Sequence, residues 1–481
     1  MSREAARLNL LEPFDSYRRR LSPGGESCED RVGEYLSSIA AKNHLNAFLT
    51  VLKEEALADS RAVDKKIAAG TAGPLAGMVV AVKDVLSMKG TRTTCGSKIL
   101  GKFEAIYDAT VIERLKAADA IIIGKTNMDE FAMGSSTENS AYGPVKNPID
   151  ETRVPGGSSG GSAVAVAAGM AATALGSDTG GSIRQPAGLC GVFGLKPTYG
   201  RVSRYGLVAF ASSFDQIGPF ANSARDIAHL LGTIAGYDER DSTSANIPVP
   251  DYLSGMDRDL QGLRIGLPRE YFNEALPADI RDPLERRIAQ LKDAGVRFIE
   301  VGLPHAEYTI AAYYVLATAE ASSNLARYDG ARYGYRSEKA NDLVEMYTKS
   351  RSEGFGAEVK RRIMLGTYVL SAGYYDAYYR KAQRVRRLIQ KDFLDAFQNV
   401  DCLVTPISPT TAFRFGEKMD DPLQMYLSDI YTVSANLAGI PGISVPAGVD
   451  RQGLPVGIQI LGKHFDEMTL LKVADFLEAK G

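Results

Sequence analysis

Two glycine- and serine-rich segments enclose a short apolar run near the middle of the chain. They are residues 156–162, with the sequence GGSSGGS, and residues 176–182, with the sequence GSDTGGS. Glycine lets backbone N–H groups approach a ligand closely, and a serine hydroxyl can give or accept a proton. Residues 163–170 between them lack polar side chains, which predicts a buried element that holds both loops in place. We interpret the loops as a catalytic or anion-binding site; the alternative is a pair of tight turns between packed elements.

The composition of the 481-residue chain excludes several kinds of site. With 56 basic and 58 acidic residues, its net charge of −2 offers no electrostatic surface for wrapping nucleic acid, although a partner could hold the nucleic acid. The four cysteines have no CxxC spacing, and no two of the four histidines lie three or four residues apart. We therefore expect neither a disulfide framework nor a metal site in this chain.

The chain also lacks the apolar segments that direct a protein to a membrane. Residues 1–9 are charged and have no apolar signal core, and no run of about 20 apolar residues occurs in the sequence. Cysteines without a pairing pattern fit a reducing compartment. We expect a cytoplasmic protein that does not bind a membrane.

Apolar runs and helical periodicities alternate along the chain in the manner of an α/β fold. The runs that predict strands are residues 77–82, 120–123, 263–267, 402–406, 442–446 and 456–460, and the first of them is expected to be buried on both faces. Residues 1–66 have helical spacing and are predicted to form an N-terminal helical segment, whereas residues 67–481 form the catalytic domain. Within that domain, residues from about 277 to 399 are mainly helical and are expected to form a layer over the sheet.

Lys83 follows the first of these apolar runs directly, at the end of an expected buried strand. Burial disfavours the charged ammonium and can lower the pKa of a lysine by several units, which makes lysine a general base near neutral pH. The alternative is a lysine that reaches solvent and pairs with the adjacent Asp84. Lys125, which follows the second apolar run, is assigned a structural role.

Two catalytic schemes fit the serines. In the first, Ser158 or Ser159 is the nucleophile of a G-x-S-x-G elbow, which needs a strand directly before it and a later acid and histidine. Residues 151–155, with the sequence ETRVP, are polar and contain proline, which disfavours that strand. In the second scheme, Lys83 is the base, Ser158 relays the proton and Ser182 attacks.

The second scheme needs no histidine, but it needs hydrogen-bond donors for a tetrahedral oxyanion. The second glycine–serine segment supplies them next to the nucleophile. The predicted oxyanion hole consists of the backbone N–H groups of Thr179, Gly180, Gly181 and Ser182.

Residues 156–199, with Lys83 upstream, resemble the amidase signature family. The Ser-cisSer-Lys triad of that family matches Ser182, Ser158 and Lys83. The resemblance covers nearly the whole chain and is greatest to the glutaminase subunits of tRNA-dependent amidotransferases, in residues 127–139, 196–206 and 436–442 among others. It implies an α/β fold with a large central mixed sheet covered by helices on both faces.

The same resemblance implies a reaction and partners. Ser182 would attack the side-chain amide of glutamine, ammonia would leave, and water would release glutamate. The ammonia would pass to a second subunit, B, which binds charged tRNA and uses ATP and Mg²⁺ to activate Glu-tRNA(Gln) or Asp-tRNA(Asn). A small third subunit, C, would bind between them, and no cofactor is expected in this chain.

Free glutamine carries an α-carboxylate and an α-ammonium, so a selective pocket needs an arginine and an acidic residue. By resemblance, Arg362 matches the carboxylate binder and Asp429 the ammonium binder. Without the resemblance, each residue would be interpreted as a surface charge on a helix. Tyr313 is a further candidate for a pocket hydroxyl. Met133 either lines the pocket or packs in the core.

Two other functions are weighed against this one. A free-standing amidase of the same family would act on other amides, but a neutral substrate has no use for the charges of both Arg362 and Asp429. A non-catalytic scaffold subunit would only bind its partners, which the intact set of Lys83, Ser158 and Ser182 disfavours. In the family pattern, Asp178 and Arg184 brace the nucleophile loop.

Overall fold

An eleven-stranded mixed sheet forms the centre of the computed structural model, which describes residues 10–22 and 24–480. The strand order is β1-β3-β2-β4-β6-β5-β10-β11-β9-β7-β8. The strands are β1 (Phe48–Val51), β2 (Val79–Lys83), β3 (Ile121–Thr126), β4 (Thr173–Asp178), β5 (Phe193–Lys196), β6 (Gln216–Ala221), β7 (Arg264–Pro268), β8 (Arg297–Val301), β9 (Cys402–Pro406), β10 (Gly442–Val449) and β11 (Pro455–Gly462). The α/β fold class with a large mixed sheet is confirmed.

Strand β2 shows why these runs are apolar at every position. It pairs in parallel with β3 on one side and β4 on the other. Val80 and Val82 pack into one hydrophobic cluster, whereas Val79 and Ala81 pack into a second cluster on the opposite face. The strand is therefore buried on both faces, as its composition predicts.

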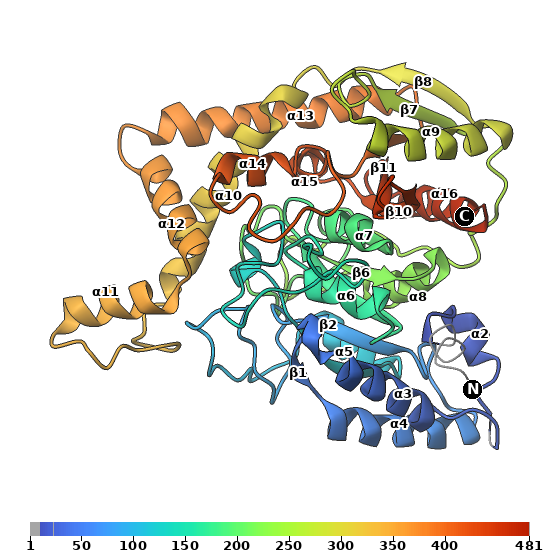
Figure 1. Cartoon of the computed structure of the whole chain (residues 1–481), viewed down its shortest axis with the longest axis horizontal. Coiled ribbons are helices and arrows are strands. Elements are labelled where there is room, and N and C mark those ends of the chain that lie inside the picture. Colours follow the sequence, from blue (N-terminus) through green and yellow to red (C-terminus); the bar gives the residue numbers. More distant parts are fainter. Residues whose placement is uncertain (1–9, 23, 481) are drawn as a thin grey trace.

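Helices cover the two faces of this part of the sheet. On the face of Val79 lies α6 (Gly160–Ala167), the apolar element between the two serine segments; α5 (Thr110–Ala117) and α8 (Ala224–Ile234) lie on the other face. Ser223 caps α8 by accepting a hydrogen bond from the N–H of Asp226. Figure 1 shows α6 and α7 (Arg184–Cys190) near the middle of the molecule.

Residues 277–399 are mainly helical, although residues 328–342 form neither helix nor strand. The helices are α9 (Ala278–Asp293), α10 (Thr309–Asn324), α11 (Leu343–Gly354), α12 (Ala357–Leu370), the π-helix η5 (Tyr375–Arg380) and α13 (Lys381–Ala396). The segment also contains β8, which pairs in parallel with β7 at the sheet edge. Its charged residues Arg297 and Glu300 break the apolar pattern of a strand and are typical of an edge. In Figure 1, α11 projects from the left side of the molecule.

The N-terminal segment contributes to the sheet as well as to the helices. It contains α2 (Phe14–Arg18), α3 (Cys28–Ala41) and α4 (Lys53–Ala68), but also β1, which pairs antiparallel with β3. Residues 1–9 lie outside the described residues. The division of the chain at residue 66 stays a prediction.

The remaining helices lie in the C-terminal part of the chain: α14 (Pro422–Leu427), α15 (Val433–Ala438) and α16 (Glu467–Ala479). In the parts of the chain that the structure describes, no helix is long and apolar enough to cross a membrane. The same residues contain no group of three histidine, cysteine, aspartate or glutamate side chains placed to hold a metal ion.

Candidate active site

Lys83 is the last residue of β2, and its side chain is fully buried. Its Nζ lies 2.8 Å from Ser158 Oγ, 2.8 Å from Ser159 Oγ and 2.9 Å from Ser177 Oγ. Within the described residues, no carboxylate forms an ion pair with it, because Asp84 pairs instead with Lys125, at 2.9 Å. Burial lowers the pKa of Lys83 to about 7.

The two serine loops are joined through their backbones. The N–H of Ser159 donates to the carbonyl oxygen of Ser182 at 3.3 Å, and the peptide bond between Gly157 and Ser158 is cis. Ser182 is 7% exposed, whereas Ser158 and Ser159 are fully buried, so Ser182 is the most exposed of the three. In the described part of the chain, no hydrogen bond joins the Ser158 and Ser182 hydroxyls directly.

Asp178 braces residues 179–184, the loop of the predicted nucleophile Ser182, which we call the nucleophile loop. Its carboxylate accepts hydrogen bonds from the backbone N–H groups of Gly181 at 2.9 Å and Ile183 at 3.1 Å, and forms an ion pair with Arg184 at 3.0 Å. Burial opposes the ionised form, but the charge of Arg184 holds the pKa of Asp178 below its ordinary value. The bracing role expected of both residues agrees with these contacts.

The contact of Asp178 with Gly181 changes the predicted oxyanion hole. Since the Gly181 N–H is already donated to a carboxylate, it is not free for a substrate oxygen in this arrangement. The N–H groups of Gly180 and Ser182 donate to no acceptor among the described residues. Thr179 donates its hydroxyl to Asp215 at 2.6 Å, and the role of its N–H group stays a prediction.

Arg362 lies on α12 and is buried, with 3% of its surface exposed. Its Nε donates to Glu358 Oε1 at 2.8 Å. The guanidinium carbon lies between 5.3 and 5.6 Å from the ring centroids of three aromatic residues, Phe210, Tyr314 and Tyr426. The sequence-only interpretation as a surface charge is therefore wrong for Arg362.

Asp429 lies between α14 and α15 and is also buried. Its Oδ2 accepts hydrogen bonds from Ser135 Oγ at 2.7 Å and from Tyr314 Oη at 3.1 Å. In the described residues no cation pairs with this carboxylate, and burial raises its pKa to about 7. Tyr314 thus contacts both charged groups, with its ring over Arg362 and its hydroxyl on Asp429.

Tyr313 and Met133 differ in how closely they approach this site. A Cβ built on Gly180 would lie 2.4 Å from Tyr313 Oη, so the tyrosine hydroxyl lies directly against the nucleophile loop. Burial raises the pKa of Tyr313 well above its ordinary value. Met133 is fully buried in the main hydrophobic cluster, and its role as a pocket residue stays a prediction.

The contacts of several polar residues of the site are not indicated by the sequence alone. Ser159 and Ser177 contact Lys83, and Ser135 and Tyr314 contact Asp429. Ser135 lies in the stretch 127–139 that carries the family resemblance, and that stretch was the available signal. Tyr314 directly follows Tyr313 on one helix, so its position in the sequence gave no separate signal.

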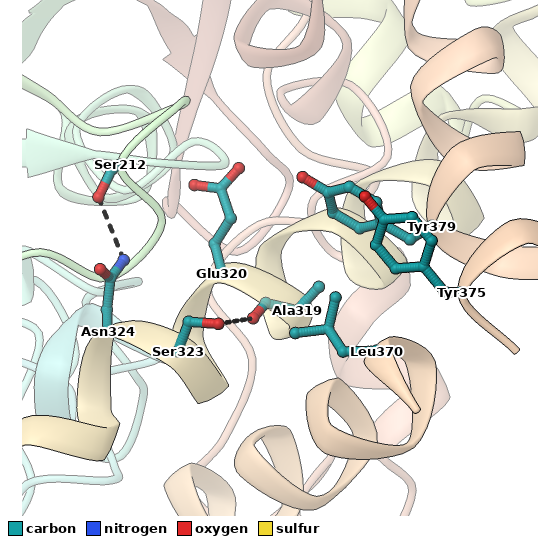
Figure 2. A pocket seen from close by; sticks show the side chains of 8 residues that line it. All are labelled: Ser212, Ala319, Glu320, Ser323, Asn324, Leu370, Tyr375 and Tyr379. Carbon is teal, nitrogen blue, oxygen red and sulfur yellow. Dashed lines mark hydrogen bonds between the residues drawn. The ribbon is translucent and has the colours of Figure 1, made fainter. Parts of the chain in front are cut away.

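Two hollows lie near these elements. A cavity of about 70 Å³ adjoins Arg362 and is also lined by Glu358, Lys418 and Tyr426. A larger hollow of about 360 Å³ lies between α10 and η5. Figure 2 shows the side chains that line it, among them Glu320, whose carboxylate points into the hollow. None of the predicted site residues lines this larger hollow, whose lining is Ser212, Ala319, Glu320, Ser323, Asn324, Leu370, Tyr375 and Tyr379.

Curated relatives cover nearly the whole chain. A protein of Carboxydothermus hydrogenoformans, named as the A subunit of glutamyl-tRNA(Gln) amidotransferase, is 62% identical over 440 residues, which cover 91% of this chain and 90% of the relative. The protein of the same name from Prosthecochloris aestuarii is 57% identical over 473 residues, covering 97% of this chain and 99% of the relative.

A solved structure and a family model agree with these relatives. The crystal structure of the glutamyl-tRNA(Gln) amidotransferase A subunit from Thermotoga maritima superposes with a TM-score of 0.82 at 43% identity, covering 98% of this chain and 95% of that chain. The family model described as Amidase matches residues 30–471. The resemblance seen in the sequence is confirmed, and the chain belongs to the amidase family.

Proposed function

We propose that this chain is the glutamine-hydrolysing A subunit of a glutamyl-tRNA(Gln) amidotransferase. The observation that carries the proposal is the pair of buried, oppositely charged groups, Arg362 and Asp429, in one aromatic cluster. These groups suit the α-carboxylate and α-ammonium of free glutamine. Arg362 already pairs with Glu358, but a neutral amide would leave Asp429 without a cationic partner. The names of the curated relatives and of the Thermotoga maritima structure support the same function.

The surroundings of Lys83 match a neutral amine. Such an amine has two N–H groups and one lone pair, and three hydroxyls lie within 2.9 Å of Nζ. The Ser159 hydroxyl donates to the carbonyl oxygen of Ser177 at 3.1 Å, so it must accept from Lys83. With the second N–H on the Ser177 hydroxyl, the lone pair is left for the proton of Ser158.

The reaction then proceeds through a proton relay. Ser182 Oγ attacks the side-chain carbonyl carbon of glutamine, while its proton passes through Ser158 to Lys83. The N–H groups of Gly180 and Ser182, with Thr179 as a further donor, stabilise the oxyanion. Lys83 returns the proton through Ser158 to the amide nitrogen, the C–N bond breaks and ammonia leaves. Water then hydrolyses the acyl-enzyme ester and releases glutamate.

Ammonia made here needs an acceptor elsewhere. We assign that step to a B subunit that binds charged tRNA, ATP and Mg²⁺ and converts Glu-tRNA(Gln), and by extension Asp-tRNA(Asn), to the amidated form. A small C subunit completes a heterotrimer, in the cytoplasm where tRNA is charged. The word subunit in the names of the relatives supports an assembly of more than one chain.

Co-expression of this chain with candidate B and C subunits tests the function. We expect co-purification and glutamine-dependent formation of Gln-tRNA(Gln). Ser182→Ala should abolish the glutamine-dependent reaction and leave the reaction with added ammonium chloride intact. Hydrolysis of neutral amides in preference to glutamine would instead indicate a free-standing amidase, and an unchanged rate for Ser182→Ala would indicate a scaffold.

A further inference from the structure

Gln185 is a fully buried glutamine with no role in the reaction described above. It is the second residue of α7, three positions after Ser182. Its backbone N–H donates to the carbonyl oxygen of Gly181 at 2.8 Å, which ties it to the nucleophile loop. Both ends of its side-chain amide are also in use, on two other segments of the chain.

The carbonyl end of that amide holds the loop of the relay serine. Gln185 Oε1 accepts a hydrogen bond from the N–H of Gly157 at 3.0 Å, and Gly157 is joined to Ser158 by the cis peptide bond. Gln185 Oε1 also packs tightly against Gly156, because a Cβ atom on Gly156 would be too close to this oxygen to be accommodated. The position of Gln185 therefore constrains the backbone that presents the Ser158 hydroxyl to Lys83.

The Nε2 end of the same amide binds Ser135, the residue whose hydroxyl contacts Asp429. Gln185 Nε2 donates to the carbonyl oxygen of Ser135 at 2.9 Å, and the Ser135 hydroxyl donates to Asp429 Oδ2 at 2.7 Å. An amide group is planar, so with both ends engaged it has a single orientation that satisfies both hydrogen bonds. A shift of Ser135 must then appear at Gly157.

We propose that Gln185 is a positioning residue that couples binding of the substrate ammonium at Asp429 to the placement of Ser158 for proton transfer. The proposal rests on the assignment of glutamine as substrate. A substrate with the ammonium fixes Asp429 and Ser135, and the Gln185 amide passes that constraint to the relay loop. A substrate without the ammonium leaves Ser135 less constrained, and Ser158 is then less well placed.

A double-mutant cycle in the assembled amidotransferase tests this coupling. Ammonia release is measured with glutamine and with 4-carbamoylbutanoate, which is glutamine without its α-amino group. If Asp429→Asn and Gln185→Met each lower kcat for glutamine about tenfold, the double variant should also lose about tenfold, because both act through one chain of contacts. A loss of about a hundredfold would mean independent sites and would overturn the proposal.

The single variants Asp429→Asn and Gln185→Met should also differ in their effects on KM. Asp429→Asn should raise KM for glutamine as well as lower kcat, whereas Gln185→Met should leave KM within about threefold and lower the preference in kcat for glutamine over 4-carbamoylbutanoate. Gln216→Met is the matched control. Gln216 is equally buried, but among the described residues its side-chain amide donates only to the carbonyl oxygen of Asp215, so its replacement should preserve that preference.

A measurement without a Gln185 variant decides the matter if Gln185→Met does not fold. In the Ser182→Ala complex, amide hydrogen exchange of residues 156–159 is followed with each of the two compounds bound. Glutamine should slow exchange of the Gly157 N–H, and 4-carbamoylbutanoate should not. Equal effects of both compounds would overturn the coupling, whereas failure of the wild-type complex to hydrolyse glutamine would instead overturn the proposed function.

Discussion

Lys83 and Lys125 are both fully buried, on the neighbouring parallel strands β2 and β3, but their surroundings differ. Lys83 contacts the hydroxyls of three serines and has no carboxylate partner among the described residues. Lys125 pairs with Asp84 at 2.9 Å and contacts the Thr93 hydroxyl at 3.3 Å. The only carboxylate next to Lys83 in the sequence is thus used by its neighbour.

The comparison shows that burial alone does not make a lysine a base. Burial penalises every ammonium, but a carboxylate at ion-pair distance compensates for the lost hydration, and serine hydroxyls do so only in part. Burial lowers the pKa of Lys83 to about 7, and because Lys125 takes Asp84, Lys83 has no carboxylate at ion-pair distance among the described residues. We therefore regard Lys125 as a structural ion-pair partner and Lys83 as the proposed base.

Replacing Lys83 gives the largest expected effect on activity. Lys83→Met keeps most of the side-chain volume but removes the proton acceptor, so kcat for glutamine hydrolysis should fall about 10²- to 10⁴-fold. The measurement is glutamate release by the assembled complex, with ammonia-dependent amide formation as the control. Turnover within a few-fold of wild type would assign the base to another group.

Replacing Lys125 should lower the stability of the fold rather than act directly on the rate of glutamine hydrolysis. Lys125→Met leaves the buried Asp84 carboxylate without its partner, which should lower the free energy of unfolding by about 3 to 5 kcal/mol. Urea unfolding monitored by circular dichroism measures the change. The double variant Lys125→Met with Asp84→Asn removes the unpaired charge and should recover part of the loss; no recovery would mean that packing, rather than charge, holds this pair.

The two lysines also show what could be predicted from the sequence. The apolar runs predicted β2 and β3, and the glycine–serine segments predicted both serine loops, because these signals are local. The ion pair of Asp84 with Lys125 depends on the pairing of two strands, and adjacency suggested Lys83 as the partner instead. Ser135 and Asp429 lie 294 positions apart, so only the folded chain reveals their contact.

Contacts made only in the folded chain also explain the other differences between the predicted and the observed structure. Strand β8 is short and charged at two of its five positions, and its pairing with β7 outweighs its weak pattern. Arg362 and Asp429 were placed by family resemblance, because nothing in their local sequence indicates burial. The engagement of the Gly181 N–H by Asp178 depends on the turn geometry of the nucleophile loop.

The pH dependence of kcat separates Lys83 from Asp429 in one experiment. Since the base must be neutral, and the pKa of Lys83 lies at about 7, kcat should rise with pH through 7 and lie about tenfold below its plateau at pH 6. Asp429, whose pKa is also about 7, must be ionised to bind an ammonium. Saturating glutamine keeps it ionised, so its titration should act mainly on KM. Asp429→Asn should therefore retain the rise in kcat, and its loss in that variant would assign the rise to Asp429.

A third buried lysine, Lys196, gives the smallest expected change in kcat and tests whether a lowered pKa is enough to make a lysine the base. Burial lowers the pKa of Lys196 to about 7 as well, but its Nζ donates to the carbonyl oxygen of Pro197 and to no serine among the described residues. If contact with the relay serine makes the base, Lys196→Met should keep kcat within about threefold of wild type. A loss as large as that of Lys83→Met would mean that a lowered pKa in this core, rather than contact with Ser158, is the decisive property.

Lys196→Met should change the pH dependence of the free energy of unfolding, although it leaves kcat nearly unchanged. The unfolded chain holds the Lys196 proton up to about its ordinary pKa of 10.5, whereas the folded chain releases it near 7. Between these values the unfolded state binds more protons, so the free energy of unfolding rises with pH. Lys196→Met removes this contribution while that of Lys83 remains, so denaturant unfolding at several pH values should show a shallower rise, and an unchanged slope would contradict the lowered pKa.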